Sequence, residues 1–300
     1  MKTLTFEKNH CNLIDTSAPA PGPGQVLVRL RGTILDETHL TDYRSGELQA
    51  PYLVSAVVLQ PGSGVIDFRR GQPVVTVVSQ PLSQYLVVNK ELLIPVEHDR
   101  GANCMFMGIA LASRAVPYAE KYPESTVIGG AGFVGLTLSA LLQTTTPWFF
   151  GTSDQALMCA QDLGAAHYKE WDQVAEDLER DERDEKGYGA TLIETTGRLQ
   201  ERQLSQFLTL KGGTVVCATP PGPGSEVLDI DAYRIHYDQI TWVALGPCGK
   251  EDVDGATAHL DSIPDTLITA QLDFDQVQYA FEELDAERGI CFLLTDDAEL

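Results

Sequence analysis

The order of apolar and polar positions divides the chain into two parts. Up to about residue 100, short β-branched or alternating runs stand between turn signals, such as Gln25–Arg31 after Pro-Gly-Pro-Gly and Pro73–Val78 after Arg-Gly-Gln. This pattern is typical of strands joined by tight turns. From Ser125 to about Leu245, apolar runs alternate with longer stretches of helical periodicity. We therefore predict a β domain followed by a parallel, doubly wound sheet with helices between its strands.

The second part contains five strand-like runs: Thr126–Ile128, Trp148–Phe150, Ala190–Ile193, Thr214–Ala218 and Ile240–Leu245. The tail then offers a helical run, Asp275–Leu284, and an apolar run, Ile290–Leu294, which is expected to return to the first domain. The predicted fold class is α/β. Residues 1–115, completed by residues 246–300, are expected to form the β domain, and residues 116–245 the doubly wound domain.

The most informative motif lies where the first strand of the second part runs into a helix. Gly130, Gly132 and Gly135 form the pattern G-x-G-x-x-G between that strand and helix. In a dinucleotide-binding turn the first glycine permits the tight bend, the second lets the pyrophosphate approach the backbone, and the third lets helix and strand pack closely. Strand, turn and helix agree here, so the sequence predicts binding of a nicotinamide or similar dinucleotide.

The end of the next strand bears on which dinucleotide binds. An acidic residue would grip the ribose 2′-hydroxyl of NAD at this position, but the chain reads Gly151, Thr152 and Ser153. The missing carboxylate and the two hydroxyls favour NADP. No Arg or Lys follows until Lys169, so the usual cation for a 2′-phosphate is missing too, and NAD stays possible.

Length, charge and apolar content exclude several classes of protein. The chain has 300 residues, enough for two domains, and a formal net charge of −22, which disfavours a nucleic-acid partner. No uninterrupted apolar stretch of about 18 residues exists and the N-terminus lacks the apolar core of a signal peptide. We therefore expect a cytoplasmic protein with no membrane partner.

Several segments, in order, resemble the medium-chain dehydrogenase/reductase superfamily over about residues 1–294. They are PGPGQVLVRLRG, QPGSGVIDFRRGQPVVT, SQYLVVNKELLIPV, MGIALASRAV, VIGGAGFVGL, DLGAAHY, GATLIETTG, LKGGTVVCATP and LITAQLDFDQVQYAFEEL. The resemblance implies a GroES-like β domain followed by a Rossmann domain and a C-terminal return to the first. It also implies a homodimer, formed edge to edge through the last Rossmann strand, Ile240–Leu245, and a small-molecule substrate.

The chain departs from the zinc-dependent members of that superfamily. Their ligand positions fall in the region Gly32–His39, near Tyr52 or Leu53, and at Met107, none of which supplies a soft tetrahedral set, and the cysteine-rich lobe is missing. Asp36, Glu37 and His39 are the residues that would make a makeshift metal site, but the sequence offers no second cluster of metal ligands to complete it. We therefore expect no metal and a zinc-independent, shortened member.

Zinc-free members are commonly NADPH-dependent reductases of quinones or activated alkenes. The resemblance thus implies an NADP(H)-preferring oxidoreductase that reduces a small carbonyl, quinone or enone. The segment MGIALASRAV looks more like polyol dehydrogenases, which leaves a metal-free alcohol or polyol dehydrogenase open. A third alternative is a dinucleotide-binding regulatory or structural protein whose catalytic function has decayed along with the zinc ligands.

The candidate site residues follow from the motif and the resemblance. Beside the three glycines, the residues expected to line the cofactor are Phe133, Val134, Thr152, Ser153, Thr195, Thr196, Gly197, Ala218, Thr219, Pro220, Leu245 and Gly246. For catalysis we expect Tyr52 as oxyanion donor and His39 as proton source, with Asp36 or Glu37 to orient His39. The plainer alternatives are a surface histidine, a packing tyrosine and an Asp36 that caps a helix.

Overall fold

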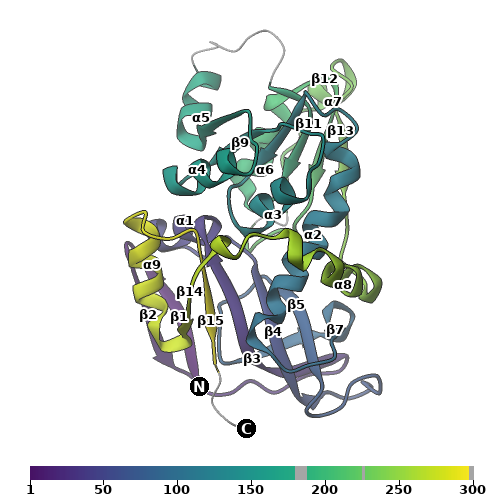
Figure 1. The fold of residues 1–300 in the computed structure, drawn as a ribbon. Helices are drawn as coiled ribbons and strands as arrows, with labels where there is room; N and C mark the ends of the chain where they lie inside the picture. The colour runs from purple at the N-terminus through teal and green to yellow at the C-terminus, as the bar shows by residue number, and fades with distance from the viewer. Residues whose placement is uncertain (180–187, 225–226, 297–300) are drawn as a thin grey trace.

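The computed structural model describes residues 1–179, 188–224 and 227–296, and these form two large sheets, one in each half of the molecule (Figure 1). The lower half in Figure 1 holds both chain ends and the mostly antiparallel sheet, and the upper half holds the parallel one. None of the helices among the described residues combines the length and the apolar character needed to cross a lipid bilayer.

The sheet of the β domain combines strands from both ends of the chain. Its order is β14-β15-β3-β4-β5-β7, and β6 pairs with β3 as well. The strands are β3 (Gln25–Asp36), β4 (Tyr52–Pro61), β5 (Pro73–Val78), β6 (Tyr85–Asn89), β7 (Ile94–Pro95), β14 (Ile268–Asp273) and β15 (Cys291–Thr295), with a separate hairpin of β1 (Lys2–Glu7) and β2 (His10–Asp15). The expected strand at Pro73–Val78 is confirmed to the residue, and the strand expected from Gln25 continues five residues further, to Asp36.

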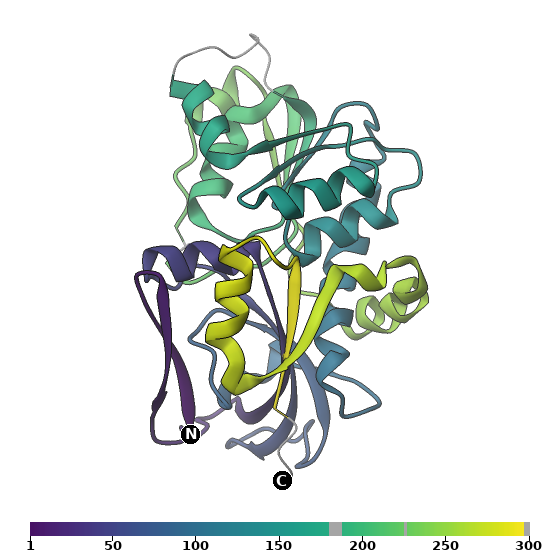
Figure 2. The same ribbon diagram turned by 60° about the vertical axis from the view of Figure 1, so that its left-hand side comes forward.

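The tail returns to the first domain as predicted. Strand β15 runs antiparallel to β3, with Cys291 opposite Asp36 and Thr295 opposite Gly32. Helix α9 (Val277–Asp285), shown in yellow in Figure 2, packs with Phe281 against Phe6 and Tyr43. The end of β3 is therefore held in place by the last strand of the chain.

The second sheet is parallel throughout, in the order β10-β9-β8-β11-β12-β13. Its strands are β8 (Thr126–Gly129), β9 (Trp148–Gly151), β10 (His167–Glu170), β11 (Gly189–Glu194), β12 (Thr209–Cys217) and β13 (Thr241–Ala244). All five predicted strands are present. The sequence did not indicate β10, because an edge strand reading His-Tyr-Lys-Glu carries no apolar pattern. The order reverses between β8 and β11, which is where ligands bind in doubly wound sheets.

Helix α2 (Cys104–Ala119) joins the two halves. A Cβ added to Gly108 would lie 2.6 Å from the Phe133 ring of the Rossmann domain and 3.0 Å from Leu53 of the β domain, so one apolar core extends across both. The other α-helices are α1 (Glu37–Ser45), α3 (Phe133–Leu141), α4 (Asp154–Asp162), α5 (Trp171–Glu179), α6 (Leu199–Leu208), α7 (Ala232–His236) and α8 (Lys250–Ala256); short 3-10 turns span Lys90–Leu92, Gly101–Asn103, Thr257–Ser262, Asp265–Leu267 and Phe274–Gln276.

Candidate functional site

The glycine turn between β8 and α3 has the close-packed geometry that its sequence predicts. Gly130 adopts φ +122°, a conformation that disfavours a side chain. A Cβ at Gly135 would lie 1.9 Å from the carbonyl oxygen of Gly130, so only glycine lets α3 approach the strand this closely. Gly132 precedes the first residue of α3, Phe133. The amides of the turn therefore face the edge of the sheet where an anion would bind.

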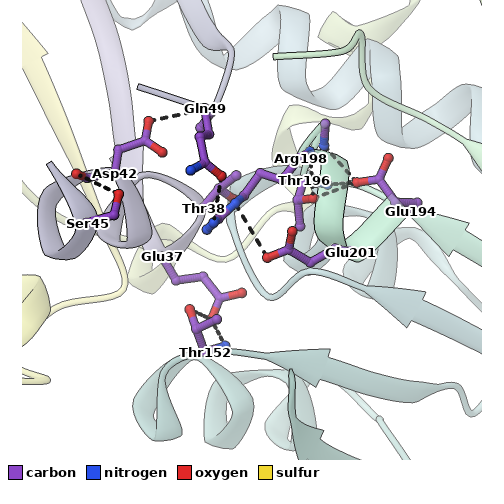
Figure 3. A network of polar contacts seen from close by, with 12 residues as sticks. Glu37, Thr38, Asp42, Ser45, Gln49, Thr152, Glu194, Thr196, Arg198 and Glu201 are labelled. Atoms are coloured by element: carbon purple, nitrogen blue, oxygen red, sulfur yellow. Dashed lines mark hydrogen bonds and ion pairs between the residues drawn. The ribbon is translucent and has the colours of Figure 1, made fainter. Parts of the chain in front are cut away.

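Two carboxylates of the β domain already occupy this turn. The Phe133 amide donates to Asp36 Oδ2 at 2.6 Å, and the Ala131 amide donates to Glu37 Oε1 at 2.6 Å. Glu37 Oε2 accepts from the amides of Thr152 at 2.8 Å and Ser153 at 3.1 Å, at the end of β9 (Figure 3). We call these four amide donors the cradle. The cradle thus holds an internal pair of acids.

The local sequence explains why the acids reach so far. Asp36 is the last residue of β3 and the N-cap of α1, where its Oδ1 accepts from the Thr38 amide at 2.9 Å. Asp36 therefore caps its own helix, the plainer of the two roles considered for it, and caps α3 through its other oxygen. Glu37 is the first residue of that helix, so its side chain projects past the sheet into the Rossmann domain.

Burial sets the charge state of the acid pair. Desolvation raises the pKa of Glu37 to about 7, against the hydrogen bonds that the cradle amides donate to it. Burial would also raise the pKa of Asp36, but the hydrogen bond and charge of His39 outweigh it and the pKa is lowered. Burial alone would lower the pKa of His39, and contact with Asp36 raises it instead. We infer a charged Asp36–His39 pair beside a Glu37 that titrates near neutrality.

His39 lies at the cleft, as predicted, but it is not a surface residue. It is 3% exposed, with Nδ1 3.1 Å from Asp36 Oδ1 and Nε2 3.2 Å from the carbonyl oxygen of Pro51. Its ring lines a cavity of only about 20 Å³ between the two domains. Asp36 therefore orients His39, which was one of two expected possibilities.

The expected position of Tyr52 needs correction. Strand β4 alternates, so that Pro51 and Leu53 face the small cavity and Tyr52 faces the core of the β domain. Tyr52 is fully buried and stacks on the His39 ring at 4.7 Å, and its hydroxyl has no hydrogen-bond partner among the described residues. From this side of the strand the hydroxyl does not line the cleft, so it is not placed to donate to a substrate oxygen.

A buried ion pair, which the sequence analysis missed, fastens the strand ends of the cofactor side. Glu194 ends β11 and accepts through Oε1 from the Thr196 amide and hydroxyl, both at 2.6 Å, and from the Gly197 amide at 2.7 Å (Figure 3). Its Oε2 accepts from Arg202 Nε at 2.8 Å, and Arg202 also donates to the Thr219 carbonyl at 3.0 Å. The one available signal was a glutamate ending an apolar strand, within LIETTG.

A second polar contact crosses between the domains beside this pair. Arg198 Nη2 donates to Gln49 Oε1 of the β domain at 3.3 Å, and Arg198 Nε lies 3.4 Å from Glu201 Oε1 (Figure 3). Asp42 Oδ2 accepts from the Ala50 amide at 3.0 Å and so orders the loop that carries Gln49. Ser79 Oγ of the β domain also donates to the Pro221 carbonyl at 2.8 Å, so several separate polar contacts hold the domains closed.

The remaining predicted cofactor residues lie along the same edge, in different states. Those that line the small cavity are Val134, Thr195, Thr196, Thr219 and Pro220, while Phe133 and Ala218 are buried. The carbonyl oxygens of Leu245 and Gly246 accept from Arg114 of α2. Ser153 Oγ accepts from the Ala156 amide at 3.4 Å and caps α4. The nearest downstream cation, Lys169, pairs with Asp177.

A larger cavity opens beside the small one. It has a volume of about 480 Å³ and shares Val77, Leu111 and Pro220 with its small neighbour. Its lining is mostly apolar. The polar groups are the amides of Gln25, Gln80 and Asn89 and the residue Ser79, and no charged side chain of the described residues lines it. We call it the apolar cavity. Its composition suits an uncharged ligand.

A dinucleotide does not fit the cradle in this arrangement. The four amides that would hold its phosphates are bonded to Asp36 and Glu37, and a Cβ at Gly132 would lie 2.4 Å from Thr38 Oγ1, so the space above that glycine is filled by the β domain. For metals, the described residues contain no group of three or more His, Cys, Asp or Glu side chains arranged to hold an ion.

Comparison with solved structures identifies the fold. No protein-family model and no curated protein matches the chain. An alcohol dehydrogenase from Thermus sp. matches with a TM-score of 0.63 at 17% identity, covering 98% of this chain and 99% of its own. A protein assigned as a zinc-binding dehydrogenase from Sinorhizobium meliloti, bound to NADP, matches with a TM-score of 0.60 at 16% identity, covering 99% and 100%. An alcohol dehydrogenase from Escherichia coli in complex with NADH matches with a TM-score of 0.60 at 18% identity, covering 99% of each chain.

These likenesses span both domains. The chain therefore has the fold of these dehydrogenases, and the expected GroES-like domain followed by a Rossmann domain is confirmed. At such identities the likeness establishes the fold alone.

Proposed function

We propose that the protein is a zinc-independent oxidoreductase that uses NADP(H), or NAD(H), to reduce an uncharged carbonyl, quinone or enone. The observation that carries the proposal is the state of the glycine turn: the amides of Ala131, Phe133 and Thr152 all donate to carboxylate oxygens at 2.8 Å or less. A turn whose amides bind two internal carboxyl groups has the donors to bind the phosphates of a dinucleotide once the domains part.

Two features support a preference for NADP(H). The segment Gly151-Thr152-Ser153 supplies no carboxylate of its own against a 2′-phosphate, and one similar structure holds NADP. Glu37 is the acid that accepts hydrogen bonds from this segment in the closed arrangement, and it belongs to the other domain. Parting of the domains would therefore carry the negative charge away from the ribose site.

The apolar cavity supports the substrate class. A cavity of about 480 Å³ without charged lining residues in the described part of the chain disfavours a phosphorylated sugar or a sugar acid. It suits a ring or chain that is mostly hydrocarbon and carries one carbonyl. His39 lies on the wall of the adjoining small cavity and is our proposed proton donor to the substrate oxygen, through Nε2.

The test is a screen of quinones, enones and ketones that follows NADPH and NADH absorbance, run on wild type and on Val87→Trp. Val87 lines the apolar cavity and is half-buried, so an indole there should fill the space and reduce turnover at least tenfold. Val227→Trp, at a side chain that is 76% exposed, is the matched control and should leave turnover unchanged. Equal loss in both variants would refute the assignment of the cavity.

Elemental analysis tests the zinc-independent part of the proposal. We expect no stoichiometric zinc in protein purified without chelator, because the ligand positions of zinc-dependent enzymes fall on Tyr52 or Leu53 and Met107. About one zinc per chain would overturn this and would require a different means of polarising the substrate.

The self-occupied cradle favours a second candidate, a protein that binds an apolar molecule and has no use for a dinucleotide. A neutral dye such as Nile red should then bind in the apolar cavity of wild type, and the Val87→Trp variant should not bind it. NADPH and NADH would bind neither wild type nor any variant. Oxidation of either cofactor with any substrate of the screen would eliminate this candidate.

We also propose that two copies pair through β13. The strand is the last of its sheet, so one side of its backbone has no partner strand in the described structure. Nearby, Tyr233 of α7 is 63% exposed, and Tyr237, which directly follows that helix, is 57% exposed. An open apolar edge favours pairing with a second copy. Light scattering should report a dimer that tightens between 0.1 and 1 M salt, as screening reduces repulsion between acidic protomers; a monomer at both would refute it.

A further inference from the structure

The acid pair in the cradle matches what the cradle is built to receive. Asp36 and Glu37 are consecutive, so together they bring two carboxyl groups to the turn, the charged Asp36 and a Glu37 whose burial raises its pKa to about 7. Their oxygens take the amide hydrogens of Ala131, Phe133, Thr152 and Ser153, from two successive βα turns of the Rossmann domain. The β domain therefore supplies an internal ligand whose oxygens take the amide hydrogens that a phosphate group would take.

The fit of this internal ligand is close. Glu37 is 2% exposed and Asp36 is 5% exposed, so water is excluded from both. At Gly132, a Cβ would lie 2.7 Å from Asp36 Oδ2, which means that the carboxylate sits directly over the backbone that a phosphate would approach. A dinucleotide and the acid pair cannot occupy the cradle together.

The contact also joins the domains. Asp36 and Glu37 stand at the junction of β3 and α1, and every cradle amide belongs to the Rossmann domain. The separate contact of Arg198 with Gln49 lies on the far side of α1 from β9. Removal of the acid pair would thus leave the domains joined by α2, by that contact and by the hydrogen bond from Ser79 Oγ to the Pro221 carbonyl.

We propose that Asp36 and Glu37 form an intramolecular lock, an internal anion that fills the dinucleotide cradle, holds the domains closed, and must leave before a dinucleotide binds. The statement that the lock must leave before a dinucleotide binds rests on the proposed function. The lock between the two domains does not. A competing internal ligand lowers the apparent affinity by the fraction of molecules that are open. Weakening the lock should therefore strengthen cofactor binding.

Hydrogen exchange without cofactor tests the lock directly. In Glu37→Ala, the amides of Ala131, Thr152 and Ser153 lose their acceptor, and their exchange should accelerate at least tenfold. Glu37→Gln, which keeps the volume and one oxygen, should give an intermediate rate and guards against misfolding of the first variant. Glu47→Ala, at an exposed glutamate just beyond the same helix, is the control and should change nothing. Unchanged protection of all three amides in both Glu37 variants would overturn the lock.

Titration with NADPH tests the second clause. We expect Glu37→Ala to bind NADPH at least tenfold more tightly than wild type or Glu47→Ala. Equal binding to all three proteins would refute displacement while leaving the oxidoreductase proposal intact. Faster exchange with no binding of NADPH or NADH to any protein would support the lock and refute the proposed dinucleotide function. The two proposals therefore fail by different signatures.

Discussion

The cleft between the domains has two halves that differ in what fills them. In the cradle half, backbone amides of the Rossmann domain meet buried carboxylates of the β domain, and the adjoining cavity measures about 20 Å³. In the other half, apolar side chains from both domains leave about 480 Å³ open. Residues Val77, Leu111 and Pro220 line both cavities.

The two halves differ in whether the groups that line them need a hydrogen-bond partner. Unpaired amides in a closed cleft are costly, so the cradle must hold an acceptor whenever the domains meet. Apolar walls carry no such requirement, and a cavity between them can stay open. In the cradle half, the carboxyl groups of Asp36 and Glu37 therefore occupy the amide donors. In the apolar half, no side chain fills the cavity.

The largest expected effect comes from removing the buried ion pair that fixes the strand ends beside the small cavity. Glu194→Ala should lower the free energy of unfolding by about 3–5 kcal/mol, because it leaves the buried Arg202 guanidinium unpaired and frees the loop at Thr196. Denaturant unfolding measures it. Glu194→Gln removes the charge but keeps an acceptor for that loop, so it should cost less; equal costs in the two variants would show that this acceptor adds nothing beyond the ion pair.

Gly132→Val should abolish binding in the cradle and leave the apolar cavity unchanged. Its Cβ would meet Thr38 Oγ1 at 2.4 Å and Asp36 Oδ2 at 2.7 Å, so neither the internal acid nor a pyrophosphate fits. NADPH titration by fluorescence should show no binding, while Nile red should still enter the apolar cavity. Gly255→Val is the control, since a Cβ there meets no atom within 4 Å. Retained NADPH binding in Gly132→Val would mean that the turn is structural only.

The two candidate catalytic residues should separate in turnover. His39→Ala should lose ~10²–10³ in turnover, the usual cost of one donor to a developing oxyanion. Tyr52→Phe should keep wild-type turnover, because its hydroxyl lies in the core without a partner among the described residues. The assay uses the best substrate from the screen. The reverse result would restore Tyr52 as the oxyanion donor.

The pH dependence of the cradle half should follow Glu37. Its pKa is raised from 4.5 to about 7, so the protonated form stabilises the fold fully below about pH 4.5, and this stabilisation is lost as the pH rises through about 7. Between pH 5 and pH 8, wild type should lose stability relative to Glu37→Gln by at most roughly 3 kcal/mol. Parallel curves for the two proteins would show that Glu37 does not titrate in this range.

Local pattern was enough to predict most of the fold. Runs such as Trp148–Phe150 and the three glycines carry their own periodicity and backbone demands, so strands and turn follow from neighbours in sequence. The orientation of Tyr52 could not be predicted from local pattern in the same way. Side chains alternate along β4, so an alignment shifted by one residue moves a side chain from the cleft to the core. Pro51 and Leu53, on either side, line the small cavity instead.

The acid pair could not be read from the sequence at all. Glu37 and Ala131 are 94 positions apart, and nothing around Glu37 indicates which distant amide it meets. Its neighbours predict a helix start, which is correct, and give no sign of a contact between domains. Such contacts depend on how two finished sheets sit against each other, which short-range patterns do not encode.

The pairing of Cys291 with Asp36 has a consequence for how the protein is made. On the ribosome, all six strands of the parallel sheet emerge before β15, so the glycine turn can fold while β3 still lacks its neighbour on that side. Folding usually proceeds from the N-terminal domain onward during synthesis, but here the first domain finishes last. The end of β3, which carries Asp36, therefore lacks its β15 neighbour until synthesis has passed residue 295, and the acid pair gains that support last.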